Sequence, residues 1–207
     1  MSITTSFRTY AVAALAALTV LLAIPLSAHA ATDIYLTFND APAAGLVGES
    51  NDKALPRAIN LKEFEWSIEN PATIGSSSGG AGTGKAKFEP LTIKKAVDAS
   101  SPGLMAAAGK GTPIAGATIV VRNGNAGAAD TFLQYRLQTV FVTRVRAAAA
   151  SGDEGVEETV ELRYGALTQR YVPSKPGASG VAQKPIVNGW DQVVNQQMTE
   201  WAGPVLG

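Results

Sequence analysis

The chain has 207 residues, with 17 basic and 17 acidic side chains, a single histidine and no cysteine. This balance leaves no basic excess to neutralise phosphates, so we expect no nucleic-acid partner. Disulfides are excluded, and His29 lies in a segment that we expect to be removed, so the usual nucleophile–base pairs and the best zinc ligands are both missing. We therefore expect a protein that is not an enzyme and that uses no cofactor or metal.

The N-terminal segment has the three-part pattern of a secretory signal peptide. Residues 1–10 are polar with Arg8 as their only charge, and residues 11–24 are almost wholly apolar. A transmembrane anchor is the alternative, but a membrane span needs about 20 apolar residues. Pro25 interrupts this run after 14 residues. We therefore expect a signal peptide over residues 1–30 and no stable membrane insertion once it is removed.

Small residues follow the apolar run. Ala28 and Ala30 occupy the two positions that a signal peptidase reads, which predicts cleavage before Ala31 and export to the periplasm or the cell exterior. The remaining length suits one domain, which we place at residues 31–191. We expect the C-terminal tail, residues 192–207, to fray or to form a helical turn or two.

Four segments upstream of residue 123 alternate apolar and polar residues at the period of a half-buried strand. They are Asp33–Phe38, Arg57–Glu69, Lys85–Ile93 and Ile114–Arg122. In the second segment, Phe64 and Trp66 share the apolar side, and core packing is the simplest reading of Trp66. The four segments predict a mainly β protein.

Residues 75–84 form a glycine/serine tract with little side chain to pack, which predicts an extended loop outside the core. Its glycines are Gly75, Gly79, Gly80, Gly82 and Gly84. Together with Lys85, the tract nearly spells the GxxxxGK phosphate-binding loop. Ala86 stands where that motif needs a serine or threonine, and a strand pattern follows in place of a helix. We therefore expect no nucleotide site.

One short helix is predicted between the third and fourth strand-like segments, over residues 100–109. Ser100 or Ser101 is a suitable cap, Pro102 fits the first turn, and Leu104–Ala108 are mostly strong helix formers. Gly109 is expected to close the helix. A helix this short must pack against the rest of the domain to persist.

The longest strand pattern spans Thr131–Val172 and predicts a hairpin whose arms of about 15 residues exceed the usual 3–10. The apolar side consists of Leu133, Tyr135, Leu137, Phe141 and Val145 in the first arm and Val160, Leu162 and Tyr164 in the second. The apolar phase then shifts to Leu167 and Tyr171 beside Gly165-Ala166, which predicts a β-bulge. Strands this long are expected where a sheet curls on itself. We predict a small closed β-barrel with the short helix packed against it.

Polar residues fill the other side of the hairpin and its turn. Gln134, Arg136, Gln138, Arg144 and Arg146 are expected to face solvent from the first arm. The carboxylates near the turn are Asp153, Glu154, Glu157 and Glu158. They lack the spaced oxygen ligands of a calcium loop, so a solvated hairpin tip is expected.

The order and spacing of several short motifs resemble those of the Hcp family, the haemolysin-coregulated tube proteins of type VI secretion systems. The motifs are Ile34–Phe38, Gly48–Ser50, Phe64–Ser67, Gly84-Lys85, Phe88–Lys95, Asp98, Ser101-Pro102, Leu104-Met105, Glu158–Val160, Tyr171 and Asn188–Asp191, the last with Trp190. They extend over nearly the whole exported chain.

The resemblance implies a small β-barrel with a helix against it, subunits that associate into hexameric rings, and rings that stack into a hollow tube for effector cargo. It also implies that the glycine/serine tract reaches the next ring, and that sheath or spike proteins are partners. The signal peptide departs from the family, because typical members leave the cytoplasm through the secretion machine itself. A monomeric secreted binding module that keeps the barrel without the ring is the alternative.

Overall fold

The computed structural model describes residues 32–39, 45–73, 82–124, 131–152, 155–173 and 184–206. The predicted cleavage residues Ala28, Ala30 and Ala31 lie outside these ranges, and so do Gly75, Gly79 and Gly80. The chain divides into two units, residues 1–30 and 31–207, and the architecture below is that of the second unit. Among the described residues, no helix has the length and apolar character needed to cross a membrane.

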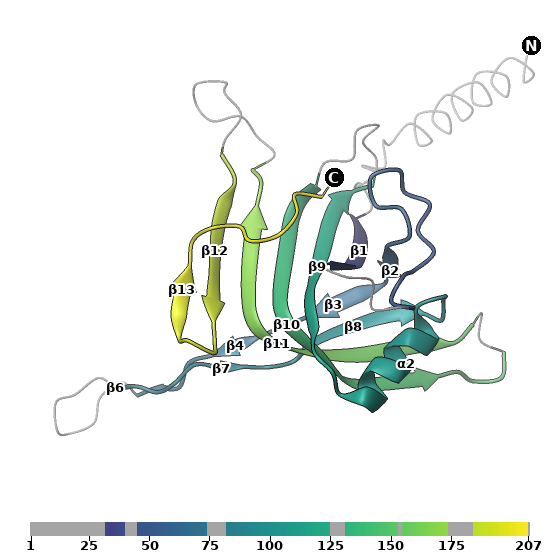
Figure 1. Ribbon diagram of the computed structural model, residues 1–207, viewed down its shortest axis with the longest axis horizontal. Coiled ribbons are helices and arrows are strands. Elements are labelled where there is room, and N and C mark those ends of the chain that lie inside the picture. Colours follow the sequence, from purple (N-terminus) through teal and green to yellow (C-terminus); the bar gives the residue numbers. More distant parts are fainter. Residues whose placement is uncertain are drawn as a thin grey trace, which may run out of the picture. The chain divides into compact units, whose positions relative to one another are not determined.

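Antiparallel strands in the described part of the chain form one nine-stranded sheet (Figure 1). They are β1 (Thr32–Asn39), β2 (Ile59–Leu61), β3 (Glu63–Glu65), β8 (Leu91–Ala96), β9 (Ile114–Asn123), β10 (Thr131–Ala148), β11 (Glu157–Tyr171), β12 (Ile186–Asp191) and β13 (Gln196–Met198). A narrow ribbon leaves this sheet, in which β4 (Ile68–Glu69) pairs with β7 (Lys87–Phe88) and β5 (Ala72–Thr73) pairs with β6 (Gly82–Thr83).

The sheet curls on itself because β11 is long enough to have different neighbours along its length. Its first half pairs with β8 and its second half with β12. From β11 the wall continues through β10, β9 and β1 to β2. Residues 59–65 complete it, because β2 pairs with β1, β3 pairs with β8, and the Lys62 N–H between them donates to the Lys94 carbonyl at 2.8 Å. β12 and β13 extend the sheet beyond this barrel.

The apolar sides of these strands enclose the core. Leu36 of β1, Ile93 of β8, Ile119 of β9 and Leu162 of β11 are all fully buried, and so is Leu104 of the helix α2 (Ser101–Lys110). Each such side chain stabilises the fold by roughly 1.5–3 kcal/mol relative to an exposed position. The predicted fold class, mainly β with one short helix, is confirmed.

The helix begins where the sequence predicts and ends later. Pro102 lies in its first turn, and Gly111 closes it with a left-handed backbone, φ 64°, its N–H donating to the Ala107 carbonyl at 3.0 Å. The prediction that Gly109 ends the helix is therefore wrong. Both glycines suit a helix end, but only Gly111 takes the left-handed conformation that favours glycine.

The hairpin of β10 and β11 changes its core-facing side partway along, without the predicted bulge. Tyr164 packs in the core before Gly165 and Leu167 after it, while the paired residues keep their register across this point. Thr139, opposite Gly165, instead has a positive φ of 52°. A β-carbon on Gly165 would lie 3.3 Å from the Thr139 β-carbon. This glycine therefore marks a close approach of two strands, not an inserted residue.

The apolar side of β10 is shifted accordingly. Val140 and Val142 lie in the core, whereas Phe141, predicted to point inward, is half-buried and outside that cluster. The register shift of the hairpin lies between Val142 and Arg144. A simple alternation through Thr139 misses both changes, because the period of two holds only while the backbone stays extended.

The C-terminal tail neither frays nor forms a helix over the residues described. After β13, the chain crosses the outer side of the sheet, where Leu206 packs against Leu55 and Val120. The Gln134 side chain donates from Nε2 to the Leu206 carbonyl at 3.2 Å. Gln134 and Arg136, predicted to face solvent, are consequently buried.

Candidate functional site

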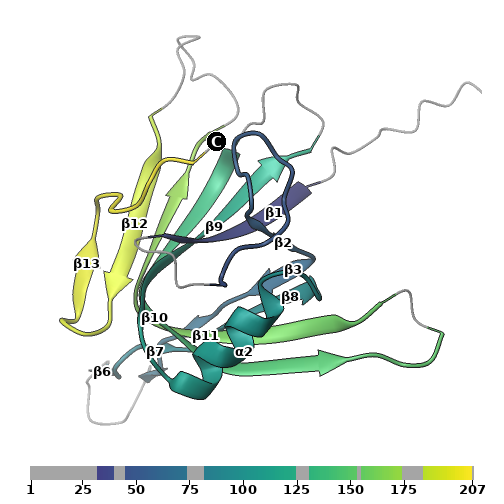
Figure 2. The same cartoon turned by 45° about the vertical axis from the view of Figure 1, so that its right-hand side comes forward.

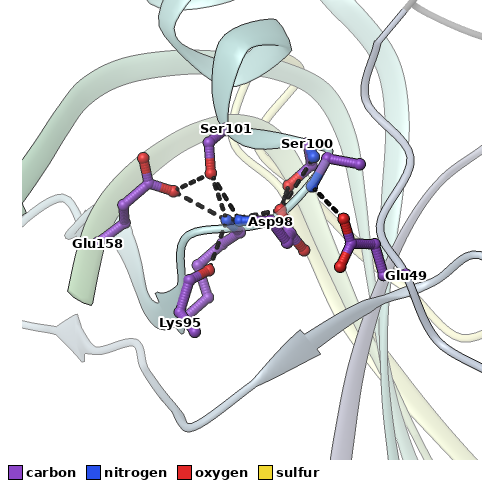
Figure 3. A network of polar contacts seen from close by, with 8 residues as sticks. Glu49, Lys95, Asp98, Ser100, Ser101 and Glu158 are labelled. Atoms are coloured by element: carbon purple, nitrogen blue, oxygen red, sulfur yellow. Dashed lines mark hydrogen bonds and ion pairs between the residues drawn. The ribbon is translucent and has the colours of Figure 1, made fainter. Parts of the chain in front are cut away.

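A buried cluster of charged and hydroxyl side chains attaches the start of α2 to the barrel (Figure 3). Lys95 of β8 is fully buried. Its Nζ lies 2.8 Å from Glu158 Oε2 and 2.8 Å from Asp98 Oδ1. It also donates to Ser101 Oγ and to the Ala96 carbonyl, each at 2.9 Å. Every proton of this ammonium group therefore has an acceptor within reach.

The sheet register brings the two ends of this cluster together. Lys95 and Glu158 are directly opposite each other in the pairing of β8 with β11. Residues that face each other across antiparallel strands share one side of the sheet, so their side chains meet. Asp98 and Ser101 lie close to this pair because β8 ends at Ala96 and α2 begins only a few residues later, at Ser101.

The hydroxyl and carboxylate groups of the cluster also bond to one another and to nearby backbone groups. Ser101 Oγ donates to Glu158 Oε2 at 2.6 Å and accepts from the Asp98 N–H at 3.1 Å. Asp98 Oδ1 accepts from the Ser100 N–H at 2.9 Å. Ser100 occupies the N-cap position without a capping bond from its own side chain. Carboxylates at this end of α2 are favourably placed relative to the helix dipole.

This arrangement resembles a nucleophile beside a base, but its contacts join α2 to the two strands β8 and β11. A catalytic serine needs access to substrate, whereas Ser101 is buried and its only hydroxyl proton is directed at Glu158. Lys95 is held as one partner of a buried ion pair. Breaking such a pair by removing one member typically costs about 3–5 kcal/mol. The cluster therefore acts as a clamp between α2, β8 and β11.

The sequence indicates the members of this clamp without indicating that they meet. Lys95, Asp98, Ser101 and Glu158 all belong to the motifs of the family resemblance. Glu158, however, was expected at a solvated hairpin tip, and it is only 5% exposed. Its neighbour Glu157 is exposed as expected and pairs with Lys62 at 3.0 Å. The alternation of the strand separates the two, since adjacent residues point to opposite sides.

A second arrangement, which we call the aromatic groove, lies between the root of the ribbon and the far end of the sheet. It is an open hollow of about 340 Å³. Its apolar lining consists of Trp66, Ile68, Phe88, Leu167 and Trp190, and its amide side chains are Gln169, Asn188 and Gln197. Leu167 faces Trp190 and Gln169 faces Asn188 across the pairing of β11 with β12, which aligns four of these residues on one side of the sheet.

The predicted family residues lie in the core, in the aromatic groove or at the surface. The ring centroid of Tyr135 lies 5.4 Å from that of Phe64 and 5.6 Å from that of Trp66. Trp66 also lines the aromatic groove, as does Trp190. Tyr171 is 40% exposed at the end of β11. The remaining members are Pro102, exposed in the first turn of α2, and Leu104, buried beneath it. Core packing therefore explains only part of the set.

The described glycines of the tract belong to the ribbon. Gly82 pairs with Thr73, and the Gly84 N–H donates to the Pro71 carbonyl at 3.0 Å. A β-carbon on Gly84 would lie 2.7 Å from the Pro71 ring, so the close approach of the two arms favours glycine here. Strand β7 follows Lys85, where a phosphate-binding loop would continue as a helix.

Another ion pair, between Arg122 and Asp52, secures the loop between β1 and β2. Arg122 donates from Nη1 to Asp52 Oδ1 at 2.6 Å, and the same oxygen accepts the N–H groups of Ala54 and Leu55 at 2.8 Å and 3.0 Å. Burial opposes ionisation of Asp52, but the bonds from Arg122 and from these N–H groups outweigh it and lower its pKa. The loop is therefore held by an ionised carboxylate.

Tyr164 of the core is not activated as a nucleophile. Burial, with a contribution from the negative charge of Glu89, raises the pKa of Tyr164 to about 12, so its hydroxyl is a poor nucleophile at neutral pH. Its Oη has no hydrogen-bond partner among the described residues. Those residues also contain no group of three or more His, Cys, Asp or Glu side chains placed to hold a metal ion.

Comparisons with known proteins agree with this architecture. A family model described as "Type VI secretion system effector, Hcp" matches residues 35–171, more than half of the chain. Protein hcp1 of Pseudomonas aeruginosa is 27% identical, over 81% of this chain and 99% of its own length. The crystal structure of Hcp1 from Salmonella typhimurium is 27% identical, with a TM-score of 0.63 over 81% of this chain and 99% of its own.

A solved "type six secretion system protein" is similar to the same extent, at 28% identity and a TM-score of 0.70, over 81% of this chain and all of its own. The match therefore covers almost the full length of each of these relatives and is not confined to a shared fragment. The matched range includes the clamp, the ribbon and the hairpin, and such proteins are structural tube components rather than enzymes. The chain belongs to the Hcp family of type VI secretion tube proteins.

Proposed function

We propose that this protein self-associates into hexameric rings that stack into a tube. The observation that carries the proposal is the family match over residues 35–171 together with the almost complete coverage of Hcp1 relatives. A protein of this kind acts through its surfaces, so its rigid parts serve to position contacts. The clamp at Lys95 and Glu158 does this by fixing α2 to the barrel.

The ribbon formed by β4, β5, β6 and β7 is the proposed stacking element. It leaves the sheet as paired strands (Figure 1), and the glycine/serine tract, residues 75–84, supplies few apolar side chains. Such a segment contributes little to the core. Its removal is therefore expected to spare the fold while it removes the contact with the next ring.

Cargo and machine partners follow from the same proposal. Effectors would travel in the lumen of the tube, and sheath or spike proteins would contact the stacked rings. If the export signal pattern at residues 1–30 acts as a signal, the barrel would fold after passage through the general export pathway, which threads unfolded chains. The protein would then work in the periplasm or outside the cell, and a chain without cysteine folds there regardless of redox conditions.

The second candidate is a monomeric secreted binding module. The signal pattern favours it, because a ring assembled in the cytoplasm cannot be threaded. The open aromatic groove supplies a binding surface that such a monomer would present to other molecules. The two candidates differ in one measurable property, the number of subunits in the particle.

Electron microscopy of the exported chain tests the proposal, with a variant in which residues 76–82 are shortened. The intact chain is expected to form six-fold rings and tubes, and the shortened chain to form rings with few tubes at an almost unchanged melting temperature. Intact mass should begin at Ala31. Single small particles from the intact chain would favour the binding module, and retention of Met1 in a membrane fraction would contradict the export step.

A further inference from the structure

The aromatic groove lies where the ribbon leaves the barrel. In both Figure 1 and Figure 2, the ribbon passes beside one end of β12 and β13. Its root contributes Trp66, Ile68 and Phe88 to the 340 Å³ hollow. A neighbouring hollow of about 660 Å³ shares Ile68, Phe88 and Trp190 and lengthens the groove along the ribbon. Each hollow has the size of a site for a small organic ligand, about 300–1,000 Å³.

The polar side chains of the first hollow are all neutral. None of the described residues that line it is charged, and its amides are those of Gln169, Asn188 and Gln197. Gln197 donates from Nε2 to Asn188 Oδ1 at 2.8 Å, which orients this pair. The Gln169 side chain is half-buried and has no hydrogen-bond partner among the described residues. Its amide is therefore available both to donate to a ligand and to accept from one.

The second hollow repeats this chemistry. Asn70 and Asn195 line it together with Trp190. Both asparagines are exposed, and within the described part of the chain neither side chain has a hydrogen-bond partner. Among the described residues of this lining, only Lys85 is charged. The amides therefore continue along the groove beyond the first hollow.

Two tryptophans supply the broad apolar faces of the groove. Trp66 and Trp190 are both half-buried, so part of each side chain stays accessible. Neither indole N–H has a hydrogen-bond partner among the described residues. An indole combines a large flat apolar surface with one hydrogen-bond donor. The groove therefore offers flat apolar faces bordered by neutral donors and acceptors.

A sugar with the stereochemistry of glucose has matching surfaces. Its hydroxyl groups are equatorial, so each face of its ring presents C–H groups while its rim carries the hydroxyls. The C–H face suits an indole, and a hydroxyl both donates and accepts, as a side-chain amide does. Such a sugar brings no charge that the first hollow would leave without a counter-ion. Apolar side chains of a peptide would cover the Gln169 amide without pairing it, which costs free energy.

We infer that the aromatic groove binds a neutral oligosaccharide built from glucose-type rings. Trp66 and Trp190 pack against sugar faces, and Gln169 and Asn188 bond to hydroxyls at the rim. This inference goes beyond ring formation and does not depend on it. It agrees with the predicted export, because an exported protein meets the polysaccharides of cell surfaces.

Titration calorimetry with cellotetraose, a neutral glucose tetramer, tests the site on a purified chain that begins at Ala31. Saturable binding with a Kd at or below about 1 mM is expected. Trp190→Ala should weaken binding at least about tenfold, because it removes one of the two apolar faces. Trp201→Ala is the matched control, since Trp201 lies on the C-terminal tail, lines neither hollow and should be dispensable. Thermal unfolding shows whether each variant is folded.

Gln169→Met separates a sugar ligand from an apolar one and does not rely on the tryptophan variant. Methionine has a similar length but no amide, so sugar binding should weaken about three- to tenfold. Binding of a capped, uncharged peptide of leucine and serine, titrated in parallel, would not weaken. No saturable sugar binding, or sugar binding that folded variants at both positions retain, overturns the inference. Peptide binding without sugar binding assigns the groove to a polypeptide and also overturns it.

Native mass measurement of the same samples keeps this inference separate from the proposed ring. Six-subunit particles that bind no cellotetraose overturn the sugar site and leave the ring in place. A single subunit that binds cellotetraose through Trp190 and Gln169 overturns the ring and leaves the sugar site in place.

Discussion

At the scale of single residues, a substitution affects stability most when it leaves a buried charge without its partner. Lys95 and Glu158 are both buried, and each is the other's partner at 2.8 Å. A buried pair of this kind adds modest net stability compared with apolar residues, but the loss of one member leaves a charge without compensation. The position of α2 therefore depends on both members being present.

Glu158→Gln should lower the free energy of unfolding by about 3–5 kcal/mol, because the Lys95 ammonium would keep its burial and lose one of its two carboxylates. Glu157→Gln is the matched control. Glu157 is adjacent, exposed and paired with exposed Lys62, so its loss should cost roughly 0–1 kcal/mol. Urea denaturation of both variants measures the difference. Equal effects would contradict the description of the cluster as a buried clamp.

The carboxylate of Asp52 predicts a dependence of stability on pH. Its pKa is lowered in the folded protein, so its contribution is complete above the unfolded value, near 4, and disappears as the pH falls through the lower folded value. Asp52→Asn should therefore be less stable than the parent at pH 7. The two proteins should converge as the pH drops well below 4. Denaturant titrations at several pH values check this, and a gap that widens in acid would refute it.

At the scale of elements, the two glycines inside α2 differ in what surrounds them. Its sequence contains Gly103 and Gly109, and glycine is about 1 kcal/mol less favourable than alanine in a helix interior. A β-carbon on Gly103 would lie 2.1 Å from the Gly45 carbonyl oxygen, whereas one on Gly109 meets nothing within 4 Å. The first glycine lets the loop before β2 pack against the helix, and the second has no such reason.

Gly109→Ala should stabilise the protein by roughly 0.5–1 kcal/mol, since it gains helix propensity in open space. Gly103→Ala gains the same propensity but forces the helix away from the loop, and a net loss of about 1–3 kcal/mol is expected. Thermal unfolding of the two variants compares them within one helix. A stabilising Gly103→Ala would mean that the loop moves aside freely.

At the scale of the whole molecule, the strands were largely predictable and their environments were not. The alternation around Leu36, Ile119 and Leu162 reveals strands because each has one side in the core. The change of side at Thr139 depends on a left-handed backbone angle that no local pattern encodes. The burial of Gln134 depends on the C-terminal residues that cross it, a contact between segments 72 positions apart.

The candidate surfaces were predictable in part for the same reason. Trp66 and Trp190 were identified by their motifs, yet their meeting in one groove depends on the ribbon and on the pairing of β11 with β12. The sequence predicts a solvent-exposed Glu158, because charges near a turn are usually exposed. Only the register with Lys95 shows that this carboxylate is enclosed.

The central claim is that this chain works as a closed ring of copies joined head to tail. Native mass spectrometry of a purified chain that begins at Ala31 measures this most directly, because it counts subunits without a lattice or a label. The account predicts one dominant species of six subunits that persists on dilution. A single subunit at every concentration tested would contradict the account.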